Sequence, residues 1–140
     1  MSAFESEIRV RFGDVDAAGI AYFPRIHGYL HEVFEELWER HVGVRYAELI
    51  AGRRIGFPLV HSSVDFRSPL RFGDRATVRV TCTKLGRSSL TLRYRFAVDS
   101  RLCVDARQTT ATVRLDTLEP LPMPDEFRPR FAAIFEEPTP

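Results

Sequence analysis

This sequence of 140 residues contains only two cysteines and no apolar run long enough to cross a membrane. Two cysteines are too few for a disulfide scaffold. Cys82 and Cys103 both lie in strand-like runs, which predicts buried free thiols in a reducing compartment. Residues 1–7 lack the apolar centre of a secretory signal peptide. We therefore expect a cytoplasmic protein without membrane insertion.

An excess of charge of one sign is also missing. The 20 Lys and Arg residues nearly balance the 19 Asp and Glu residues, which leaves a net charge of +1. This balance does not indicate a nucleic acid or an anionic membrane as a partner. The sequence has no Gly-rich phosphate loop and no internal repeat. Its length and its apolar content of 44% fit one globular domain with a substantial core.

Hydrophobic periodicity predicts an α+β fold. Apolar residues recur at helical spacing over 24–42, opposite a charged face, and Gly43 supplies a C-terminal stop. A shorter helix is expected over 46–51. Alternation with a period of two predicts strands over 4–12, 59–67, 75–85, 88–99 and 102–115. Short links between the last four strands predict an antiparallel meander, with the long helix packed across its concave face.

The segment between the first strand and the long helix carries the main functional signal. Residues 11–25 read Arg-Phe-Gly-Asp-Val-Asp-Ala-Ala-Gly-Ile-Ala-Tyr-Phe-Pro-Arg. Pro24 stands where the helix should begin, so the N–H groups near Phe23 point out of a positive helix end that suits an oxyanion. A carboxylate shortly before such donors, here Asp14 or Asp16, is what an enzyme that attacks a carbonyl needs. Small residues around Gly19 allow a substrate to approach the backbone closely.

The run Phe-Gly-Asp-Val-Asp-Ala-Ala-Gly-Ile-Ala-Tyr-Phe-Pro resembles the signature of hotdog-fold acyl-CoA thioesterases, most closely the 4-hydroxybenzoyl-CoA thioesterase branch. The resemblance extends over about residues 8–115. It implies a hotdog fold, a curved antiparallel five-stranded sheet wrapped around one long central helix. It also implies that Asp16 is catalytic, as nucleophile or as base for water, and that the Phe23 N–H polarises the thioester carbonyl. Asp14 is expected to be an acceptor that orders the loop.

Several residues near the helix start are candidates for substrate contacts. Gly19 and Tyr22 immediately precede it, and His27 and His31 share one helical face within two turns of Phe23. The two histidines have a spacing that occurs in zinc sites, but no further Cys or His pair completes a ligand set, so we expect no metal. No cofactor is expected, because CoA is part of the substrate.

The resemblance extends the candidate site to two other segments. In the family, the strand after the helices lines the active site and often pairs with its twin across a dimer, which implicates His61, Ser62 and Ser63. Alternatively, these polar residues belong to a half-exposed strand, in which every second side chain faces solvent and has no role in the site. Basic residues at a tight turn meet the CoA phosphates in the family, usually from a neighbouring subunit. The corresponding residues are Lys84, Arg87 and Ser88, for which solvated turn side chains are the alternative.

Two other functions stay open. A hotdog hydratase or dehydratase acting on acyl chains would need His27 or His31 on its substrate channel. A non-catalytic acyl-CoA-binding protein would keep the pocket without turnover. A Ser–His–Asp triad is excluded, because His61 and Ser62 are neighbours in a strand and point to opposite faces.

The sequence also predicts domain limits, assembly and a substrate class. Residues 1–118 form the predicted thioesterase domain, and 119–140 a Pro-rich connector with a short helix over 125–135. An exposed strand edge invites pairing, and the family forms dimers and tetramers, so we expect a homodimer or homotetramer paired over 60–66. The rings and polar tips of Tyr22, His27 and His31 suit a flat aromatic acyl group such as hydroxybenzoyl better than a long alkyl chain.

Overall fold

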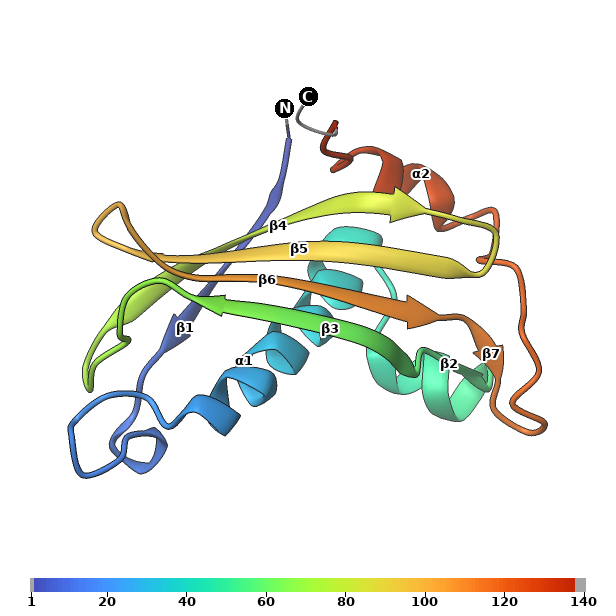
Figure 1. Cartoon of the computed structure of the whole chain (residues 1–140). Helices are drawn as coiled ribbons and strands as arrows, with labels where there is room; N and C mark the ends of the chain where they lie inside the picture. The colour runs from blue at the N-terminus through green and yellow to red at the C-terminus, as the bar shows by residue number, and fades with distance from the viewer. Residues whose placement is uncertain (1, 138–140) are drawn as a thin grey trace.

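The computed structural model describes residues 2–137 as a curved antiparallel sheet wrapped around one long helix (Figure 1). The sheet has the strand order β1-β4-β5-β6-β3. Its strands are β1 (Phe4–Arg9), β3 (Leu59–Phe66), β4 (Arg75–Leu85), β5 (Ser89–Val98) and β6 (Arg101–Ala111). A small ribbon pairs β2 (Ile55–Gly56) with β7 (Val113–Arg114). The predicted α+β class, five-stranded sheet and single long helix are confirmed.

The predicted meander of four strands is wrong in one respect. Only β4, β5 and β6 follow one another across the sheet, whereas β3 pairs with β6. The other edge of β4 is occupied by β1, which leaves β3 no place beside β4. The loop of residues 67–74 therefore crosses the end of the sheet, and β3 becomes an edge strand.

The long helix begins as α1 (Phe23–Glu36) and continues in π-helical geometry as η2 (Leu37–Val42). It starts one residue earlier than predicted, so Pro24 occupies the second helical position. A backbone N–H at this position has no partner within the helix, and the proline therefore removes no helical hydrogen bond. Gly43, with a φ of 93°, ends the helix. Apolar residues three or four apart form its buried face: Ile26, Tyr29, Leu30, Val33, Phe34, Leu37 and Trp38.

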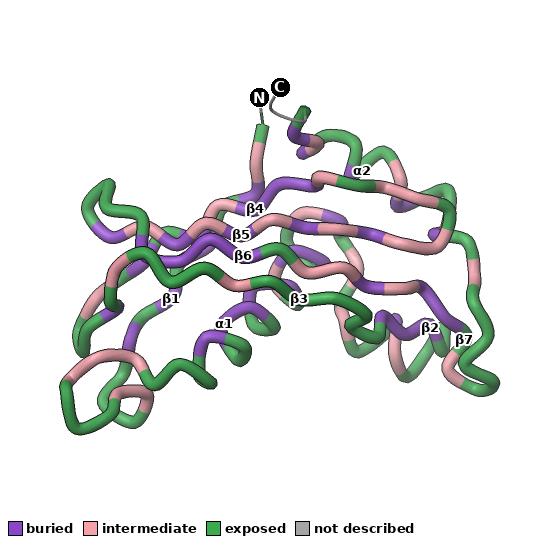
Figure 2. Tube along the Cα trace, in the orientation of Figure 1, coloured by how far each residue is buried: buried purple, intermediate pink, exposed green. Residues whose placement is uncertain are grey.

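This buried face packs against the concave side of the sheet. Alternate residues of β5 point toward the helix and are buried, as the alternation predicted: Leu90, Leu92, Tyr94, Phe96 and Val98. A short helix, η3 (Glu48–Gly52), follows η2 and precedes β2. The tube coloured by burial shows the middle of the sheet buried and β3 exposed along most of its length (Figure 2).

The segment after residue 118 belongs to the same core. Its buried side chains join the main hydrophobic cluster: Met123, Phe127, Phe131 and Ile134. Beyond α2 (Arg128–Ala132) the chain runs beside β4, where the Cys82 N–H donates to the Ile134 carbonyl at 2.9 Å and the Glu136 N–H donates to the Cys82 carbonyl at 2.8 Å. The C-terminal segment therefore continues the sheet edge where β1 stops.

Cys82 and Cys103 lie on β4 and β6 and are buried free thiols, as predicted. No helix within residues 2–137 combines the length and the apolar character needed to span a bilayer.

Glu136 attaches the C-terminal segment to the outer face of the sheet. Its Oε2 accepts hydrogen bonds from Arg93 at 3.0 Å and Arg95 at 2.9 Å, and its Oε1 accepts one from the Thr81 hydroxyl at 2.7 Å. Arg93 also donates two bonds to Asp105, at 2.9 and 2.7 Å. The hydrogen bond from Arg95 is the main reason that the pKa of Glu136 falls to about 2.

We predict that Glu136→Gln lowers the free energy of unfolding at neutral pH by about 2–3 kcal/mol, because an amide cannot pair with two guanidinium groups. The pKa of this carboxyl is lowered by folding, so its contribution is present above its usual pKa of 4.5 and is lost as the pH falls toward 2. Urea unfolding should show the difference between wild type and variant shrinking from pH 7 to about pH 3. Glu137→Gln, the exposed neighbour, is the control. A difference independent of pH would contradict the prediction.

Candidate active site

Asp16 forms the turn at the centre of the loop between η1 (Phe12–Asp14) and α1. Its Oδ1 accepts a hydrogen bond from the Ala18 N–H at 2.9 Å, and its carbonyl accepts one from the Gly19 N–H at 3.0 Å. Gly19 has a φ of 79°, a conformation that favours glycine, so this residue shapes the turn. Asp16 is exposed, and its Oδ2 accepts no hydrogen bond from the residues that the structure describes. One carboxylate oxygen therefore fixes the turn and the other is available to a ligand.

Asp14 fastens this loop to α1. Its Oδ2 accepts hydrogen bonds from the Tyr29 hydroxyl at 2.6 Å and from the Arg11 N–H at 3.1 Å. Its backbone carbonyl accepts one from the Tyr22 N–H at 2.8 Å. Burial and the bond to Asp14 raise the pKa of Tyr29 well above its usual range, so this hydroxyl stays protonated and donates. Asp14 is thus the loop-ordering acceptor predicted from the sequence.

The loop is also fastened to the connection between β3 and β4. The Ala21 N–H donates to the Leu70 carbonyl at 2.7 Å, and the Phe72 N–H donates to the Gly19 carbonyl at 3.2 Å. These bonds form because residues 67–74 cross the end of the sheet and so come next to the loop. The segment that carries Asp16 is therefore held from two sides, by α1 and by this crossing loop.

The start of α1 supplies a backbone N–H donor next to the loop. Pro24 has no N–H, and the Arg25 N–H donates to the Tyr22 carbonyl at 2.8 Å. The Phe23 N–H is the first of the helix, and N–H groups of a first turn have no partner within their helix. The positive end of the helix dipole adds to the field at this position. The arrangement suits a carbonyl oxygen that becomes negatively charged.

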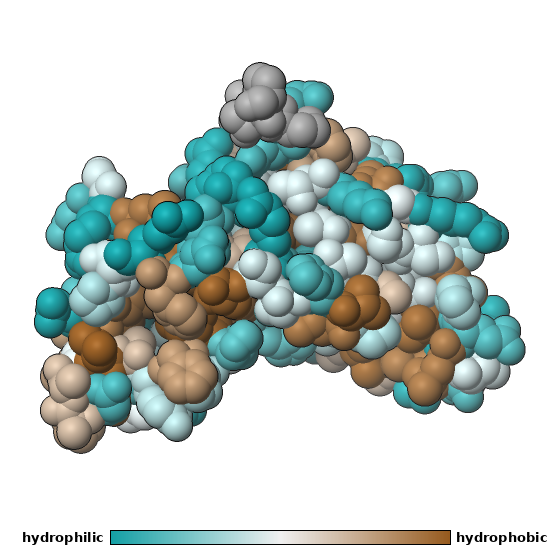
Figure 3. All heavy atoms as spheres, in the orientation of Figure 1, coloured by the Kyte–Doolittle hydropathy of each residue, from teal (hydrophilic) through white to brown (hydrophobic). Residues whose placement is uncertain are grey.

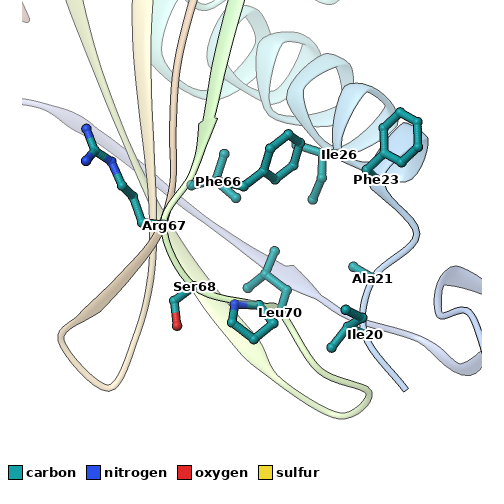
Figure 4. Close-up of a pocket in the computed structure, with 10 residues that line it drawn as sticks. Ile20, Ala21, Phe23, Ile26, Phe66, Arg67, Ser68 and Leu70 are labelled. Carbon is teal, nitrogen blue, oxygen red and sulfur yellow. The ribbon is translucent and has the colours of Figure 1, made fainter. Parts of the chain in front are cut away.

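A cavity of about 340 Å³, here called the helix-start cavity, opens beside Phe23 (Figure 4). In the close-up, Phe66 and Ile26 project toward the same space and Arg67 points away from it. Its remaining walls come from the loop, the crossing segment and β6: Ile20, Ala21, Ser68, Pro69, Leu70 and Val104. Nearly all of these side chains are apolar, so this cavity suits an apolar part of a ligand.

A second cavity of about 240 Å³, here called the polar cavity, lies farther along α1 between the helix and the sheet. His27 and His31 line it from the helix side. His31 also contacts Glu35 at 2.9 Å and packs edge-on against the Tyr46 ring. The other lining residues mix aromatic, aliphatic and polar groups: Phe34, Phe57, Leu59, Leu92, Tyr94, Gln108 and Thr110. Gln108 and Thr110 were not among the predicted site residues, because polar residues in a strand are expected to face solvent when the neighbouring strands are unknown.

The structure separates the three candidates on β3. Ser62 pairs with Gln108, whose Nε2 donates to the Ser62 Oγ at 3.2 Å, so Ser62 lies on the helix side of the sheet. His61 and Ser63 flank it in the strand and therefore point to the outer face. Within one protomer they do not face α1.

The three candidates at the turn between β4 and β5 also lie apart from the loop. Lys84, Arg87 and Ser88 are at the opposite end of the sheet from Asp16 (Figure 1). The Arg87 carbonyl accepts a hydrogen bond from the Met123 N–H at 2.7 Å, which joins this turn to the C-terminal segment. Residues 2–137 contain no group of three or more His, Cys, Asp or Glu side chains placed to hold a metal ion.

The comparison with known families decides where this loop and fold belong. Residues 10–131 match the family model described as the thioesterase-like superfamily. The chain belongs to the thioesterase-like superfamily. A 1,4-dihydroxy-2-naphthoyl-CoA hydrolase of Nostoc punctiforme is 32% identical to this member over an alignment of length 106, and the match covers 69% of this chain and 71% of that protein.

Solved structures of the thioesterase superfamily have the same fold. A 1,4-dihydroxy-2-naphthoyl-CoA thioesterase from Synechocystis matches with a TM-score of 0.83 at 26% identity, over 94% of this chain and 96% of that one. A gentisyl-coenzyme A thioesterase matches with a TM-score of 0.82 at 29% identity, over 89% and 99%. The predicted hotdog fold and the predicted enzyme class, a thioester hydrolase, are confirmed.

We predict that Tyr29→Phe lowers kcat for thioester hydrolysis about tenfold and changes KM less than threefold, because Asp14 loses its bond to α1 and the Asp16 loop loosens. Tyr46→Phe, which removes a hydroxyl that has no bond to the loop, is the matched control. Steady-state kinetics and thermal unfolding of both variants provide the measurement. An unchanged kcat in folded Tyr29→Phe would show that this bond does not position the loop.

Proposed function

We propose that this protein hydrolyses hydroxylated aromatic acyl-CoA thioesters to the free acid and CoA. The observation that carries the proposal is the attachment of the Asp16 loop to α1 through the hydrogen bonds of Asp14. This attachment holds the Asp16 carboxylate and the Phe23 N–H on adjoining segments. Membership of the thioesterase-like superfamily supports the reaction class. The substrates for which the relatives are named, dihydroxynaphthoyl-CoA and gentisyl-CoA, support a hydroxylated aromatic acyl group.

In the proposed mechanism, the Phe23 N–H donates to the thioester carbonyl and stabilises the negative charge that develops on its oxygen. Asp16 either attacks the carbonyl carbon, which forms a mixed anhydride and releases the CoA thiol, or removes a proton from an attacking water. In the first route water then hydrolyses the anhydride and regenerates the carboxylate. Gly19 and Tyr22 hold the backbone around this position. None of these steps calls for a metal or another cofactor.

The lining of the two cavities supports an aromatic acyl group. The helix-start cavity offers apolar walls directly beside Phe23, and the polar cavity adds rings and polar tips from His27, His31 and Tyr94. A long alkyl chain needs a continuous aliphatic channel, which these polar groups interrupt. A flat ring with polar substituents matches the mixture better.

We also propose a homodimer, with a homotetramer as its larger assembly, paired through β3. This edge strand exposes Leu59 by 51%, Val60 by 61% and Phe66 by 56%. Apolar atoms gather along the rim of the molecule where β3 lies (Figure 3). Two-fold antiparallel pairing of β3 would place the two sheets in opposite directions. The turn between β4 and β5 of one subunit would then approach the start of α1 in the second subunit. We expect the side chains at this turn, Lys84, Arg87 and Ser88, to contact the CoA phosphates there.

Light scattering at micromolar concentration should give two or four times the chain mass of 16.1 kDa. Val60→Lys, which places a charge in the exposed edge, should increase the monomer fraction, because pairing would bury the ammonium group. A wild-type mass of one chain would contradict the proposed assembly and the shared CoA site.

The function is tested by release of free thiol from five CoA esters: gentisyl, 4-hydroxybenzoyl, benzoyl, butyryl and palmitoyl. We predict the highest kcat/KM for a hydroxylated aromatic ester, and a loss of kcat of roughly 10²–10⁴ in Asp16→Asn, because an amide is neither nucleophile nor base. Asn still accepts the Ala18 N–H bond, so the turn should persist. Asp99→Asn, at an exposed turn with a φ of 48° that Asn tolerates, is the control.

Three results would contradict the proposal. Near wild-type turnover by folded Asp16→Asn would remove the mechanism. A tenfold or larger preference for butyryl- or palmitoyl-CoA over every aromatic ester, on the order of 1.4 kcal/mol, would remove the substrate class. Loss of water from an added sixth ester, 3-hydroxybutyryl-CoA, to give an enoyl-CoA without thiol release would indicate the hydratase alternative.

A further inference from the structure

The helix-facing side chains of β6 change from apolar to polar along the strand. Val104 and Ala106 are apolar and buried. The next two residues on the same face, Gln108 and Thr110, are polar, and both line the polar cavity. A position between a helix and a sheet ordinarily carries an apolar side chain, so this change needs a physical reason.

Thr110 is 9% exposed, and its Oγ1 has no hydrogen-bond partner among the described residues. A buried hydroxyl without a partner destabilises the fold. This hydroxyl belongs to a residue on the wall of the polar cavity, next to Gln108, whose amide nitrogen is engaged by Ser62. A ligand that brings a polar group into the cavity would satisfy Thr110.

Two other buried groups, Thr112 Oγ1 and Trp38 Nε1, also lack partners among the described residues. Neither residue lines the polar cavity. An unpaired group alone is therefore no evidence of a ligand. Thr110 differs from the other two residues because it lines the polar cavity together with a second polar residue, Gln108. Thr112, 1% exposed and two residues farther along the chain, is a matched control for Thr110.

We propose that Thr110 and Gln108 bind a ring hydroxyl of the acyl group and so determine the preference for hydroxylated over unsubstituted aromatic acyl-CoA. This inference rests on the proposed function. His27 follows Phe23 by four residues, on the order of 6 Å along the helix axis. An acyl group with its carbonyl at the Phe23 N–H and its ring along α1 therefore reaches the mouth of the polar cavity.

The chemistry of the two side chains fits a phenol. A threonine hydroxyl donates one hydrogen bond and accepts others, and the Gln108 amide oxygen accepts, so together they satisfy both the donor and the acceptor of a phenolic hydroxyl. An unsubstituted ring gains no bond there and leaves Thr110 unpaired. A site that hydrogen-bonds a substrate hydroxyl discriminates more strongly than one that measures size alone.

The test uses two thioethers that cannot be hydrolysed, 2,5-dihydroxyphenacyl-CoA and phenacyl-CoA, and measures both dissociation constants by isothermal titration calorimetry. Wild type should bind the dihydroxy compound about tenfold more tightly or better. Thr110→Val, which replaces the hydroxyl by a methyl group of similar size, should reduce this ratio to about threefold or less without weakening phenacyl-CoA. Thr112→Val and Thr110→Ser, which retain a hydroxyl at position 110, should keep the wild-type ratio.

The outcomes separate this inference from the proposed function, because the ratio is measurable whether or not the protein hydrolyses thioesters. An unchanged ratio in Thr110→Val, or an equal loss in Thr112→Val, would overturn the inference while leaving the hydrolase in place. Equal binding of the two compounds by wild type, or binding of neither, would also overturn it. Should Thr110→Val fail to fold, Gln108→Leu should lower the ratio instead.

Discussion

The hydrogen bond of 2.6 Å between the Tyr29 hydroxyl and the Asp14 carboxylate is the contact on which the candidate active site depends. Asp16 and the Phe23 N–H come from a loop and a helix that share no regular hydrogen-bond ladder, so their relative position has to come from individual bonds. Asp14 supplies them through both its side chain and its carbonyl. A displacement of about 1 Å at a carbonyl-attacking site can cost roughly 100-fold in rate, so the proposed function requires this fastening.

The crossing of β3 to the far side of the sheet has two consequences for the same site. It sends residues 67–74 alongside the Asp16 loop, where the Leu70 carbonyl and the Phe72 N–H form hydrogen bonds with the loop. It also leaves β3 as an edge with exposed apolar side chains, beside the two cavities along α1. One feature of topology therefore both stabilises the Asp16 loop and provides the surface that a second subunit would cover.

The sequence predicted what depends on local periodicity and local motifs. The limits of β4 agree with the alternation over 75–85, and the long helix starts within one residue of its proline signal. The partner of β3 was not predictable, because a period of two says nothing about which strand lies alongside. The bond of Tyr29 to Asp14 was not predictable either, because no local pattern pairs a helix residue with a loop residue 15 positions earlier. The prolines of residues 119–140 predict a connector followed by a short helix, and they conceal a second signal: Met123, Phe127 and Phe131 recur every four residues and are buried.

The central claim is that Asp16 and the start of α1 flank one thioester carbonyl, and a crystal structure of the wild-type protein with 2,5-dihydroxyphenacyl-CoA tests it most directly. The account predicts that the ketone oxygen, which stands in for the thioester carbonyl, lies about 2.7–3.1 Å from the Phe23 nitrogen. It also predicts an Asp16 carboxylate oxygen within about 3.5 Å of the carbonyl carbon. A ketone bound away from Phe23, or an Asp16 carboxylate directed away from it, would contradict the account.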